Sequence, residues 1–461
     1  MKRSFQNPII PTLPTFIGEK QTLNYKAICV FAATGFFLDQ DTYYNEQTAL
    51  KPATNYILNG NKIEDEVTYF KWYYNPIERP LQQIVQEFAE LFETIIKEQV
   101  QDQIVILPLS GGLDSRTQAA ALYHLGNEVN AYSYEFLNGH NETLYSEQIA
   151  KACGFSFQKW VVPKGYLWDK ITELAKINNC YSEFTHPRQM AFIEKYAQMG
   201  DVFNLGHWGD VLFDDMHVEE DLSNEQQIEI LVKKVVKKGG IELANSLWKS
   251  WNLQGNFEIY LKDRIRILLE NINIPTSANA QIRAFKSLYW APRWTSTNLS
   301  IFKSVKPISL PYYDDRMCKF ICTIPEKYLN GRQIQIEYLK LRMPELAKIT
   351  WQEKRPFNLY TYKNNKFPYN FPFRVLDKLK RIVSSKKFIQ RNWELQFLGE
   401  SNEKELKQWL FENDNFKNLV EPQLVFEHYS NFKNRDAVYY SHSVSMLLTL
   451  SLFAKINQYE K

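Results

Sequence analysis

The strongest constraint on the fold lies in the first third of the chain, where the pattern of a strand, a glycine turn and a helix occurs in succession. An apolar run at residues 104–107 precedes Gly111 and Gly112, and an alanine-rich helical pattern runs from Thr117 to Gly126. A short apolar run bounded by glycine is typical of a buried strand, and the pattern after it is typical of a helix. The segment therefore predicts a strand that passes through a tight turn directly into a helix.

Strands and helices continue to alternate over the next hundred residues. The predicted elements are strands at 129–136, 155–162 and 202–205 and a helix at 143–153 that Gly154 caps. Alternation at this spacing predicts an α/β fold with a parallel sheet covered by helices on both faces. Beyond residue 219 apolar positions recur at helical spacing, so the second half is expected to be mainly helical. Proline and aromatic clusters at 307–313 and 356–372 are interpreted as ordered loops.

The turn after the first of these strands reads Ser110-Gly111-Gly112-Leu113-Asp114-Ser115. Two glycines let backbone N–H groups converge on an anion, and two serine hydroxyls add donors at the start of a helix, where the helix dipole favours negative charge. The segment lacks the Gly-Lys-Ser/Thr ending of a P-loop, which disfavours a kinase or an ordinary ATPase. It predicts a phosphate cradle, and the alternative is a plain glycine turn with a capping aspartate.

Composition places few further limits on the chain. A net charge of +3 over 461 residues gives no reason to expect nucleic acid as a partner. The five cysteines include no Cys-x-x-Cys pair, which argues against a disulfide framework or a zinc ribbon and favours a reducing, cytoplasmic compartment. The basic start has no apolar core of a secretory signal. The most apolar run, from Val444 to Ile456, is too short to span a membrane and predicts a buried helix.

Four motifs in order resemble the synthetase domain of the asparagine synthetase family, which belongs to the ATP pyrophosphatase-loop superfamily. Ser-Gly-Gly-Leu-Asp-Ser at 110–115 resembles the family's pyrophosphatase loop. The segment at 204–213 is similar to Leu-Ser-Gly-Glu-Gly-x-Asp-Glu-Leu-Phe, and 311–316 resembles Pro-Phe-Leu-Asp-x-Arg. The segment at 353–357 resembles a later stretch that carries a lysine. The resemblance implies an ATP-dependent ligase that makes an acyl-adenylate, releases pyrophosphate and transfers the acyl group to ammonia or an amine.

The resemblance also implies roles for individual residues. Residues expected to bind ATP and pyrophosphate are Leu109, Ser110, Gly111, Gly112, Asp114, Ser115, Tyr134, Leu205 and Gly206. Asp114 and Asp210 are the expected Mg²⁺ ligands, since Mg²⁺ takes one or two carboxylates from a protein. Lys354 is expected to stabilise the transition state, with a solvated loop lysine as the alternative. Asp314 and Arg316 are expected to hold the second lobe in place.

The segment after the fourth strand departs from the family pattern. His207 stands where the family has a glutamate, Trp208 where it has a glycine, and Asp214 and Asp215 where it has two glycines. These changes imply a reshaped substrate site. His207 is a candidate general base for the incoming amine, because its ordinary pKa lies near neutral. An equally weighted alternative is that it only shapes the pocket.

The first 80 residues resemble the end of the family's glutaminase domain, through segments at 35–38, 41–42 and 50–52. Residues 1–80 are predicted to form a small, truncated β-rich domain, and residues 81–461 the ligase domain. Lys2 stands where the family has its nucleophilic cysteine, and Cys29 is expected inside a strand. The chain is therefore not expected to hydrolyse glutamine, and ammonia would come free, from a separate glutaminase, or as an amine of a larger molecule.

Several alternatives stay open. The acid could be a small molecule, a peptide that is cyclised, or a sugar acid, and the chain could instead be a catalytically silent ATP-binding subunit. A basic segment at 374–391 could hold an acidic partner or could be a solvated helix face. Neither the acid, the amine nor the oligomeric state follows from the sequence.

Overall fold

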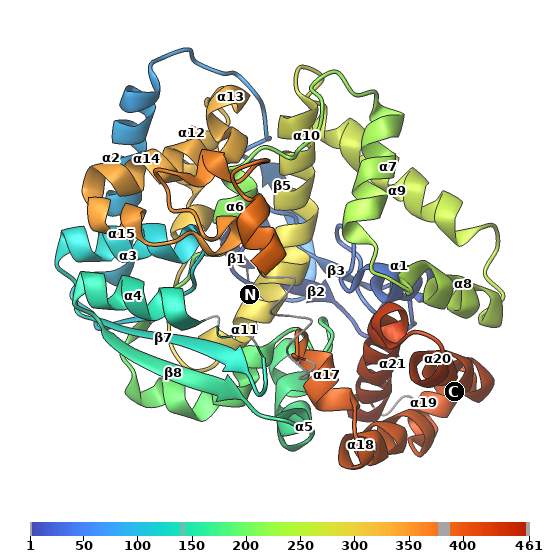
Figure 1. The fold of residues 1–461 in the computed structure, drawn as a ribbon. Coiled ribbons are helices and arrows are strands. Elements are labelled where there is room, and N and C mark those ends of the chain that lie inside the picture. Colours follow the sequence, from blue (N-terminus) through green and yellow to red (C-terminus); the bar gives the residue numbers. More distant parts are fainter. Residues whose placement is uncertain (1, 140, 142, 377–387, 458–461) are drawn as a thin grey trace.

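The computed structural model describes every residue except 1, 140, 142, 377–387 and 458–461. Its centre is a five-stranded parallel sheet in the order β10-β9-β6-β7-β8. Figure 1 shows β7 and β8 at one edge of this sheet, with α3 and α4 packed above them. The strands are β6 Val105–Pro108, β7 Val129–Phe136, β8 Ser156–Val162, β9 Val202–Asn204 and β10 Ile308–Ser309.

Four of these strands confirm the sequence prediction to within two residues at each end. β10 was not predicted, because it lies inside the proline and aromatic cluster that was interpreted as a loop. It is only two residues long and pairs with Phe203 and Asn204 of β9. A pairing this short leaves no periodicity in the sequence, so tertiary contact alone reveals it.

Helices cover both faces of the sheet. From β6 to β8 the chain moves in one direction across the sheet and then returns past β6 to β9, so right-handed connections place the two sets of helices on opposite faces. On one face lie α3 Asp114–Leu125 and α4 Thr143–Cys153; on the other lie α5 Tyr166–Asn178, the 3₁₀ helix η1 Arg188–Gln198 and α11 Ser296–Lys303. The reversal makes the gap between β6 and β9 the topological switch point, where ligands of open α/β sheets bind.

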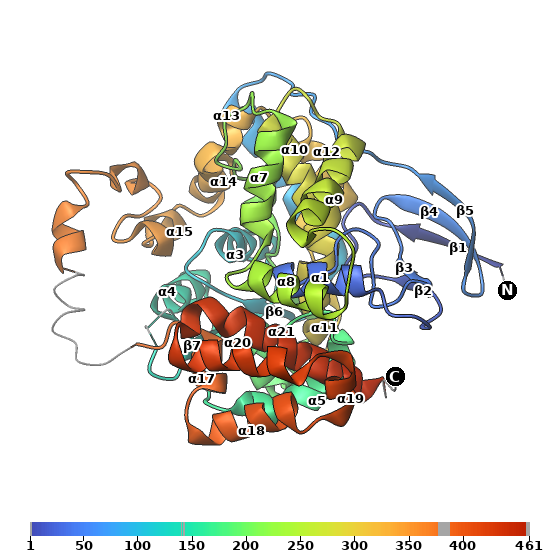
Figure 2. The ribbon, with the colours of Figure 1, turned by 90° about the vertical axis from the view of Figure 1, so that its right-hand side faces the viewer.

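The second half of the chain is mainly helical, as predicted. Figures 1 and 2 show one group of these helices beside the N-terminal region and a second group near the C-terminus. Further helices of the described chain are α2 Leu81–Val100, α6 Gly209–Leu212, α7 Asn224–Val235, α8 Gly240–Ser250, α9 Phe257–Ile272, α10 Ala278–Phe285, the π-helix η2 Lys286–Thr295, η3 Pro311–Tyr313, α12 Asp315–Ile321, α13 Glu326–Leu329, η4 Asn330–Arg332, α14 Gln333–Arg342, α15 Pro344–Lys348, η5 Gln352–Lys354, η6 Tyr362–Asn364, α17 Asn392–Phe397, α18 Glu400–Phe411, α19 Asp414–Leu419, α20 Pro422–Asn434 and α21 Ala437–Ile456.

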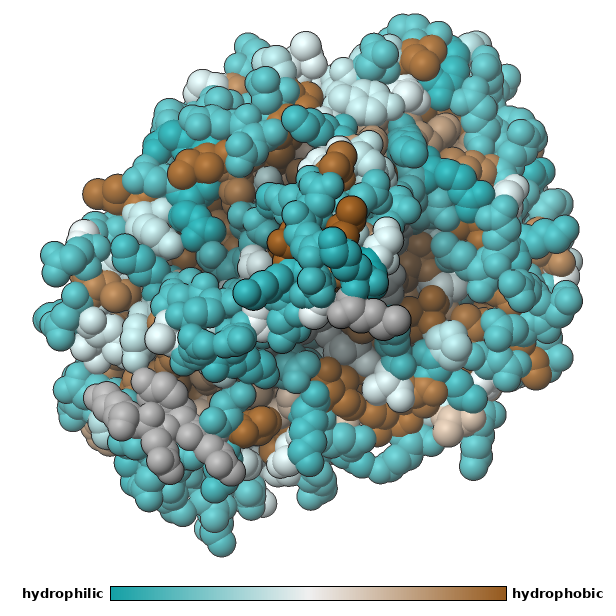
Figure 3. Space-filling view, turned by 180° about the vertical axis from the view of Figure 1, so that it is seen from behind, coloured by the Kyte–Doolittle hydropathy of each residue, from teal (hydrophilic) through white to brown (hydrophobic). Residues whose placement is uncertain are grey.

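α21 contains the apolar run that was predicted to be a buried helix. Among the described helices it alone has the length and apolar character to cross a membrane, but 78% of its most apolar window is buried inside the protein. It packs against α18, α19 and α20. The face in Figure 3 is mainly hydrophilic, with apolar residues in small groups. α21 therefore serves as a core helix of this fold.

The N-terminal region contains a small antiparallel sheet, which projects to one side in Figure 2. Its strands are β1 Lys2–Asn7, β4 Thr54–Asn59 and β5 Lys62–Thr68, and a second pair is β2 Phe16–Gly18 with β3 Gln47–Ala49. The expected strand around Cys29 was wrong, because Cys29 lies in helix α1 Tyr25–Thr34. That helix is buried from Ala27 to Thr34 and packs against α8 and α21, and burial of successive residues on all sides favours a core helix over an alternating strand. The glutaminase-like character and the boundary at residue 80 stay predictions.

Candidate active site

The predicted phosphate cradle lies between the end of β6 and the start of α3, at the switch point of the sheet. The hydroxyls of Ser110 and Ser115 lie 3.0 Å apart, and the Ser110 N–H donates to Ser115 Oγ at 3.0 Å. The Gly112 N–H donates to Ser110 Oγ at 3.3 Å. The loop thus gathers several donors in a small space at the start of a helix, as binding of a phosphate group requires.

A buried arginine anchors this loop to a distant segment. Arg116 is fully buried, and its guanidinium donates to the carbonyls of Gly111 at 3.0 Å, Ile349 at 2.9 Å and Thr350 at 2.8 Å. Burial lowers its pKa to about 10, which leaves it charged at neutral pH. Gly111 also has no room for a side chain, since a Cβ there would lie 2.5 Å from Gln352 Oε1. The loop is therefore held from behind by the segment at 346–352.

Two cavities open on either side of Ser110. The Tyr134 cavity has a volume of about 210 Å³, and its lining includes Leu109, Ser110, Tyr134 and His207. The Asp114 cavity has a volume of about 510 Å³; it is lined by Ser110, Gly112, Asp114, Ser115, Leu205, Gly206, His207 and Asp210, among others. The structure therefore brings together every predicted ATP-binding residue except Gly111, which faces Gln352, and places the two expected metal ligands in one cavity.

Two side chains from the helical half of the chain hold the carboxylate of Asp114 in this cavity. Its Oδ1 accepts hydrogen bonds from Arg332 Nη2 and, at 3.0 Å, from Gln335 Nε2. Burial raises the pKa of Asp114, Arg332 opposes that effect, and the nearby charge of Asp210 raises the pKa further. Asp114 and Asp210 are thus close enough to interact, although Asp210 is exposed to solvent.

The two carboxylates suit Mg²⁺. Carboxylate oxygens are the ligands that Mg²⁺ prefers, and one or two from the protein suffice because the ion also binds water and phosphate. Three carboxylates line the cavity, those of Asp114, Asp210 and Glu353, against the two cations Lys286 and Arg332, so its lining carries an excess of negative charge. Asp114 and Asp210 are therefore the groups that would hold Mg²⁺, which would neutralise ATP and orient the leaving pyrophosphate.

His207 lies between the two cavities and lines both. Burial lowers its pKa to about 4, and the charge of Asp210 only partly opposes this. Its buried Nδ1 has no hydrogen-bond partner in the described part of the chain. The imidazole is therefore neutral at physiological pH, and one of its ring nitrogens is buried and unpaired among the described residues.

Lys354 lies near the site but is not among the residues that line either cavity. Its ammonium lies 5.5 Å from the centre of the Trp351 ring. Its neighbours reach the site instead, because Gln352 lines the Tyr134 cavity and Glu353 lines the Asp114 cavity. The side chain is half-buried. The predicted catalytic role of Lys354 would require its long side chain to turn from Trp351 towards the phosphates.

Two cations of the Asp114 cavity, Lys286 and Arg332, were missed by sequence reasoning. Lys286 begins the π-helix η2, which includes Pro292 and also brings Trp290 and Trp294 to the cavity. Burial lowers the pKa of Lys286 to about 8. A proline inside an aromatic-rich helical stretch was the available signal, since π-helices occur frequently at functional sites. Nothing local distinguishes Arg332 from a surface arginine.

The departures from the family pattern have structural roles. Trp208 has a φ of 79°, a left-handed conformation that favours glycine, and its Nε1 donates to Ser287 Oγ at 3.0 Å. The hydrogen bond and burial offset the strain of this conformation. Asp214 Oδ1 accepts from the Gly331 N–H at 3.0 Å, which ties this segment to the turn before Arg332. Burial raises the pKa of Asp214 to about 6.

The motif at 311–316 lies outside the two cavities. Asp314 accepts a hydrogen bond from the Arg316 N–H at 2.9 Å and so caps α12. Arg316 also forms ion pairs with Asp314 at 2.9 Å and with Glu98 of α2 at 2.6 Å. These contacts join α12 to α2, and the expected role of both residues in holding the second lobe stays a prediction.

The fold and the site together define an ATP-using α/β enzyme with a pyrophosphatase-type loop. The family model for asparagine synthase matches residues 87–369. The chain belongs to the asparagine synthase family, whose members are ATP-dependent ligases that form carbon–nitrogen bonds. No match was found among curated proteins. Among solved structures, an NMN synthetase from Francisella tularensis is similar at 13% identity, covering 45% of this chain and 93% of that chain with a TM-score of 0.23.

Proposed function

We propose that this protein activates a carboxylate as an acyl-adenylate, with release of pyrophosphate, and transfers the acyl group to ammonia or an amine. The observation that carries the proposal is the arrangement at the switch point. The loop of Ser110 and Ser115, and the carboxylates of Asp114 and Asp210, line one cavity. A donor-rich loop suits the departing phosphates, and the carboxylates suit the Mg²⁺ that accompanies ATP.

In the first step a carboxylate oxygen of the substrate attacks the α-phosphorus of ATP. The bond from that phosphorus to the bridging oxygen breaks, and pyrophosphate leaves with the negative charge that develops. The N–H groups and hydroxyls of the loop at 110–115 bind this leaving group, and Lys354 adds a mobile positive charge. Arg332 lines the same cavity and would add positive charge for a phosphate group, while Asp114 and Asp210 would hold Mg²⁺.

In the second step the amine attacks the acyl carbon, AMP leaves, and the nitrogen loses a proton. His207 is neutral at physiological pH and lines both cavities, so a ring nitrogen can accept that proton. Burial disfavours the resulting imidazolium, whereas the neighbouring charge of Asp210 favours it. His207 is the proposed general base.

The amine does not come from glutamine through this chain. Cys29 is fully buried in α1, and burial raises the pKa of its thiol, so it is neither exposed nor ionised as a nucleophile must be. The other four cysteines are buried as well. Free ammonia, ammonia from a separate glutaminase, or an amine of a larger molecule is the proposed donor. The proposed acid substrate is a small molecule or a peptide. The proposed location of the protein is the cytoplasm, and neither a membrane nor nucleic acid is a proposed partner.

The decisive experiment follows an oxygen isotope. The purified protein is incubated with ATP, Mg²⁺ and a panel of small acids and peptides whose carboxylates carry ¹⁸O. Amide formation through an acyl-adenylate moves one ¹⁸O from the acid into AMP and releases pyrophosphate. The Ser110→Ala variant should lose most of the pyrophosphate release. The control is Ser304→Ala, which changes the serine that caps the C-terminal end of α11 and should release pyrophosphate as the wild type does. Production of ADP and orthophosphate would contradict the proposal.

A further inference from the structure

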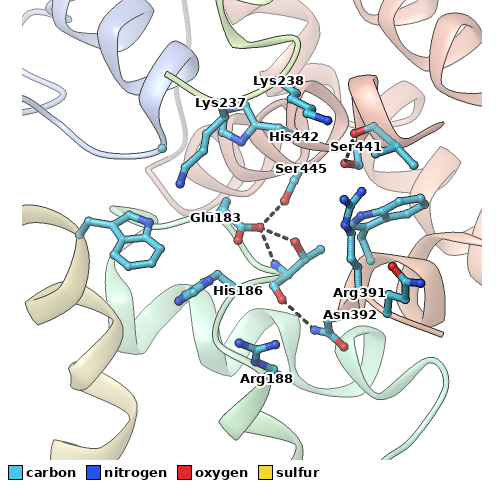
Figure 4. Close-up of a pocket in the computed structure, with 16 residues that line it drawn as sticks. Glu183, His186, Arg188, Lys237, Lys238, Arg391, Asn392, Ser441, His442 and Ser445 are labelled. Carbon is cyan, nitrogen blue, oxygen red and sulfur yellow. Dashed lines mark hydrogen bonds between the residues drawn. The ribbon is translucent and has the colours of Figure 1, made fainter. Parts of the chain in front are cut away.

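A third cavity lies beyond the two that flank the phosphate loop. It has a volume of about 430 Å³ and is called the Lys237 cavity here. Figure 4 shows its lining, which comes from the segment after α5, the turn before α8, the start of α17 and one side of α21. Residues from both halves of the chain thus enclose one space, and neither the resemblance to the asparagine synthase family nor the proposed chemistry assigns it a role.

The lining of the Lys237 cavity is strongly basic. Arg188, Lys237, Lys238 and Arg391 line it, against one carboxylate, that of Glu183. In Figure 4 Lys237 lies above Glu183 and Arg188 below it, on opposite sides of the space. In the described part of the chain none of the four cations forms an ion pair. Excess positive charge around a concave space favours an anionic occupant.

The protein already uses the single carboxylate of this cavity. Glu183 Oε2 accepts hydrogen bonds from the Thr185 N–H and hydroxyl, both at 2.7 Å, and from Ser445 Oγ at 2.6 Å. Three donors on one oxygen hold the carboxylate in place between α21 and the segment after α5. Glu183 therefore fixes the wall of the cavity and leaves most of the basic charge unbalanced.

Lys237 and Arg188 are the cations that matter most, because they are half-buried, whereas Lys238 and Arg391 are exposed and screened by water. The Lys237 ammonium lies 5.2 Å from the centre of the Trp294 ring, and burial lowers its pKa. The buried Arg188 Nε has no hydrogen-bond partner among the described residues. Arg188 lies over the Tyr134 and Phe136 rings, but its Nε donor is unpaired, and an anionic ligand would supply the missing acceptor.

Two histidines complete the polar lining without adding charge. His442 Nε2 lies 2.9 Å from the Ala32 carbonyl, to which it donates, and the His186 ring lies 4.3 Å from the Trp294 ring at a tilt of 47°. Burial lowers the pKa of each to about 3. At neutral pH both are uncharged, so the positive charge of the cavity comes from its lysines and arginines.

The Lys237 cavity adjoins both cavities of the candidate active site. Trp294 of η2 lines the Lys237 cavity and the Asp114 cavity. Arg188 at the start of η1 lines the Lys237 cavity and the Tyr134 cavity. The Lys237 cavity thus shares one side chain with each of the other two cavities. An extended molecule that lies past Trp294 would have one end near the phosphate loop and the other among the cations.

We infer that the Lys237 cavity binds a carboxylate or phosphate group of the organic substrate, at the end remote from the reacting group. The inference rests on the proposed ligase function, since it describes the substrate of that reaction. The substrate class is an extended anion: an acid or amine that carries a second negative group and spans from the Asp114 cavity past Trp294. Lys237 and Arg188 pair with that group, and Glu183 holds the wall against which it lies.

The test measures binding of two probe anions, citrate and inorganic phosphate, by isothermal titration calorimetry. The full chain is first saturated with Mg²⁺ and α,β-methylene-ATP, so that the phosphate loop is filled. The wild type should bind at least one probe, and the preferred probe shows whether the site takes a carboxylate or a phosphate. Lys237→Met should weaken binding by about tenfold or more, as expected for loss of a charge-assisted hydrogen bond. Lys237→Arg should stay within about threefold of the wild type.

Lys249→Met is the matched control, because Lys249 is an exposed lysine of α8 and the substitution removes the same charge. It should bind as the wild type does. Should Lys237→Met fail to fold, competitive acetylation of the wild type replaces it: citrate or phosphate should protect Lys237 and leave Lys249 unprotected. Binding by neither probe, equal binding by Lys237→Met, or acetylation of Lys237 unaffected by both probes overturns the inference. Failure of the wild type to bind the nucleotide analogue would instead refute the proposed ligase function.

Discussion

Arg332 donates a hydrogen bond to the carboxylate of Asp114, although the two residues lie 218 positions apart in the sequence. The arginine side chain is only 6% exposed and the aspartate 23%. Asp114 begins the helix that follows the phosphate loop, and Arg332 ends the turn before α14. The ion pair therefore joins the phosphate loop to the helical half of the chain and places a cation beside the carboxylate expected to bind Mg²⁺.

Replacing Arg332 with methionine should lower the free energy of unfolding. Asp114 would lose the cation that opposes the effect of burial on its pKa, at an expected cost of about 1–3 kcal/mol in the free energy of unfolding. Urea denaturation measures this cost. The exposed Arg316 serves as control, since its ion pairs lie near solvent and Arg316→Met should change stability by less than about 1 kcal/mol. Equal stability losses in both variants would show that the buried ion pair contributes no more to stability than an exposed one.

The Mg²⁺ dependence of pyrophosphate release should shift when either expected ligand loses its charge. Asp114→Asn and Asp210→Asn each remove one carboxylate from the Asp114 cavity, so half-maximal activity should require at least about tenfold more Mg²⁺. Titration of the metal at saturating ATP measures the shift. Asp102→Asn, at an exposed turn before β6, should leave the titration curve where the wild type has it. Unchanged curves for both site variants would exclude the two carboxylates as ligands.

The parts of this molecule that could be predicted are those with a local signal. Short apolar runs locate the strands β6 and β7, and helical periodicity followed by a glycine cap locates the helices α3 and α4. The phosphate loop follows from two glycines between a strand and a helix. The predicted helix from 117 begins three residues late, because Asp114 and Ser115 were assigned to the turn although they already belong to α3.

The parts that could not be predicted depend on contacts between distant residues. Cys29 was assigned to a strand because the run around it is apolar, and only its burial between α8 and α21 selects a helix. Arg332 and Lys286 reach the Asp114 cavity from the helical half, and no spacing in the sequence relates them to Asp114. The lysine- and arginine-rich part of the basic segment, at 377–387, lies outside the described residues, so its role stays a prediction.

Replacing Arg116 should loosen the phosphate loop from behind. Its guanidinium bonds four carbonyl oxygens, those of Gly111, Leu346, Ile349 and Thr350. Arg116→Met leaves these acceptors buried without a donor, so the free energy of unfolding should fall by about 3 kcal/mol or more. The affinity for ATP should fall as well, because Gly111 is no longer held. Urea denaturation and nucleotide titration measure the two effects, and Arg3→Met on the exposed strand β1 should show neither.

His442 should make stability fall as the pH falls. Its pKa is about 3 in the folded protein, against an ordinary value of 6.5. Above pH 6.5 the side chain is neutral in both states and adds no pH dependence. Below pH 6.5 the unfolded chain takes up a proton that the folded protein refuses, so stability is lost, by about 2 kcal/mol at pH 5.

The variant His442→Gln isolates this effect. Glutamine can still donate to the Ala32 carbonyl but does not titrate. The variant should be less stable than the wild type at pH 7.5. Between pH 7.5 and pH 5 the difference in the free energy of unfolding should change by about 2 kcal/mol in favour of the variant. Urea denaturation at the two pH values measures the difference. A deficit that stays constant with pH would show that His442 titrates alike in the folded and unfolded states.

Lys354 should matter for the chemical step and little for binding of ATP. Its ammonium lies over the Trp351 ring, while the adjacent Gln352 and Glu353 line the two cavities, so a rotation of one side chain would bring the charge to the departing pyrophosphate. Lys354→Ala should therefore lower the rate of pyrophosphate release by about a hundredfold or more and change the dissociation constant of ATP by less than about threefold. Single-turnover kinetics and nucleotide titration separate the two quantities. Lys348→Ala is the matched control, because Lys348 is exposed, pairs with Glu345 and ends the neighbouring helix α15. An equal loss of rate in both variants would assign the effect to the surface charge of this segment. A loss confined to Lys354→Ala would mean that the lysine leaves Trp351 when the acid attacks ATP.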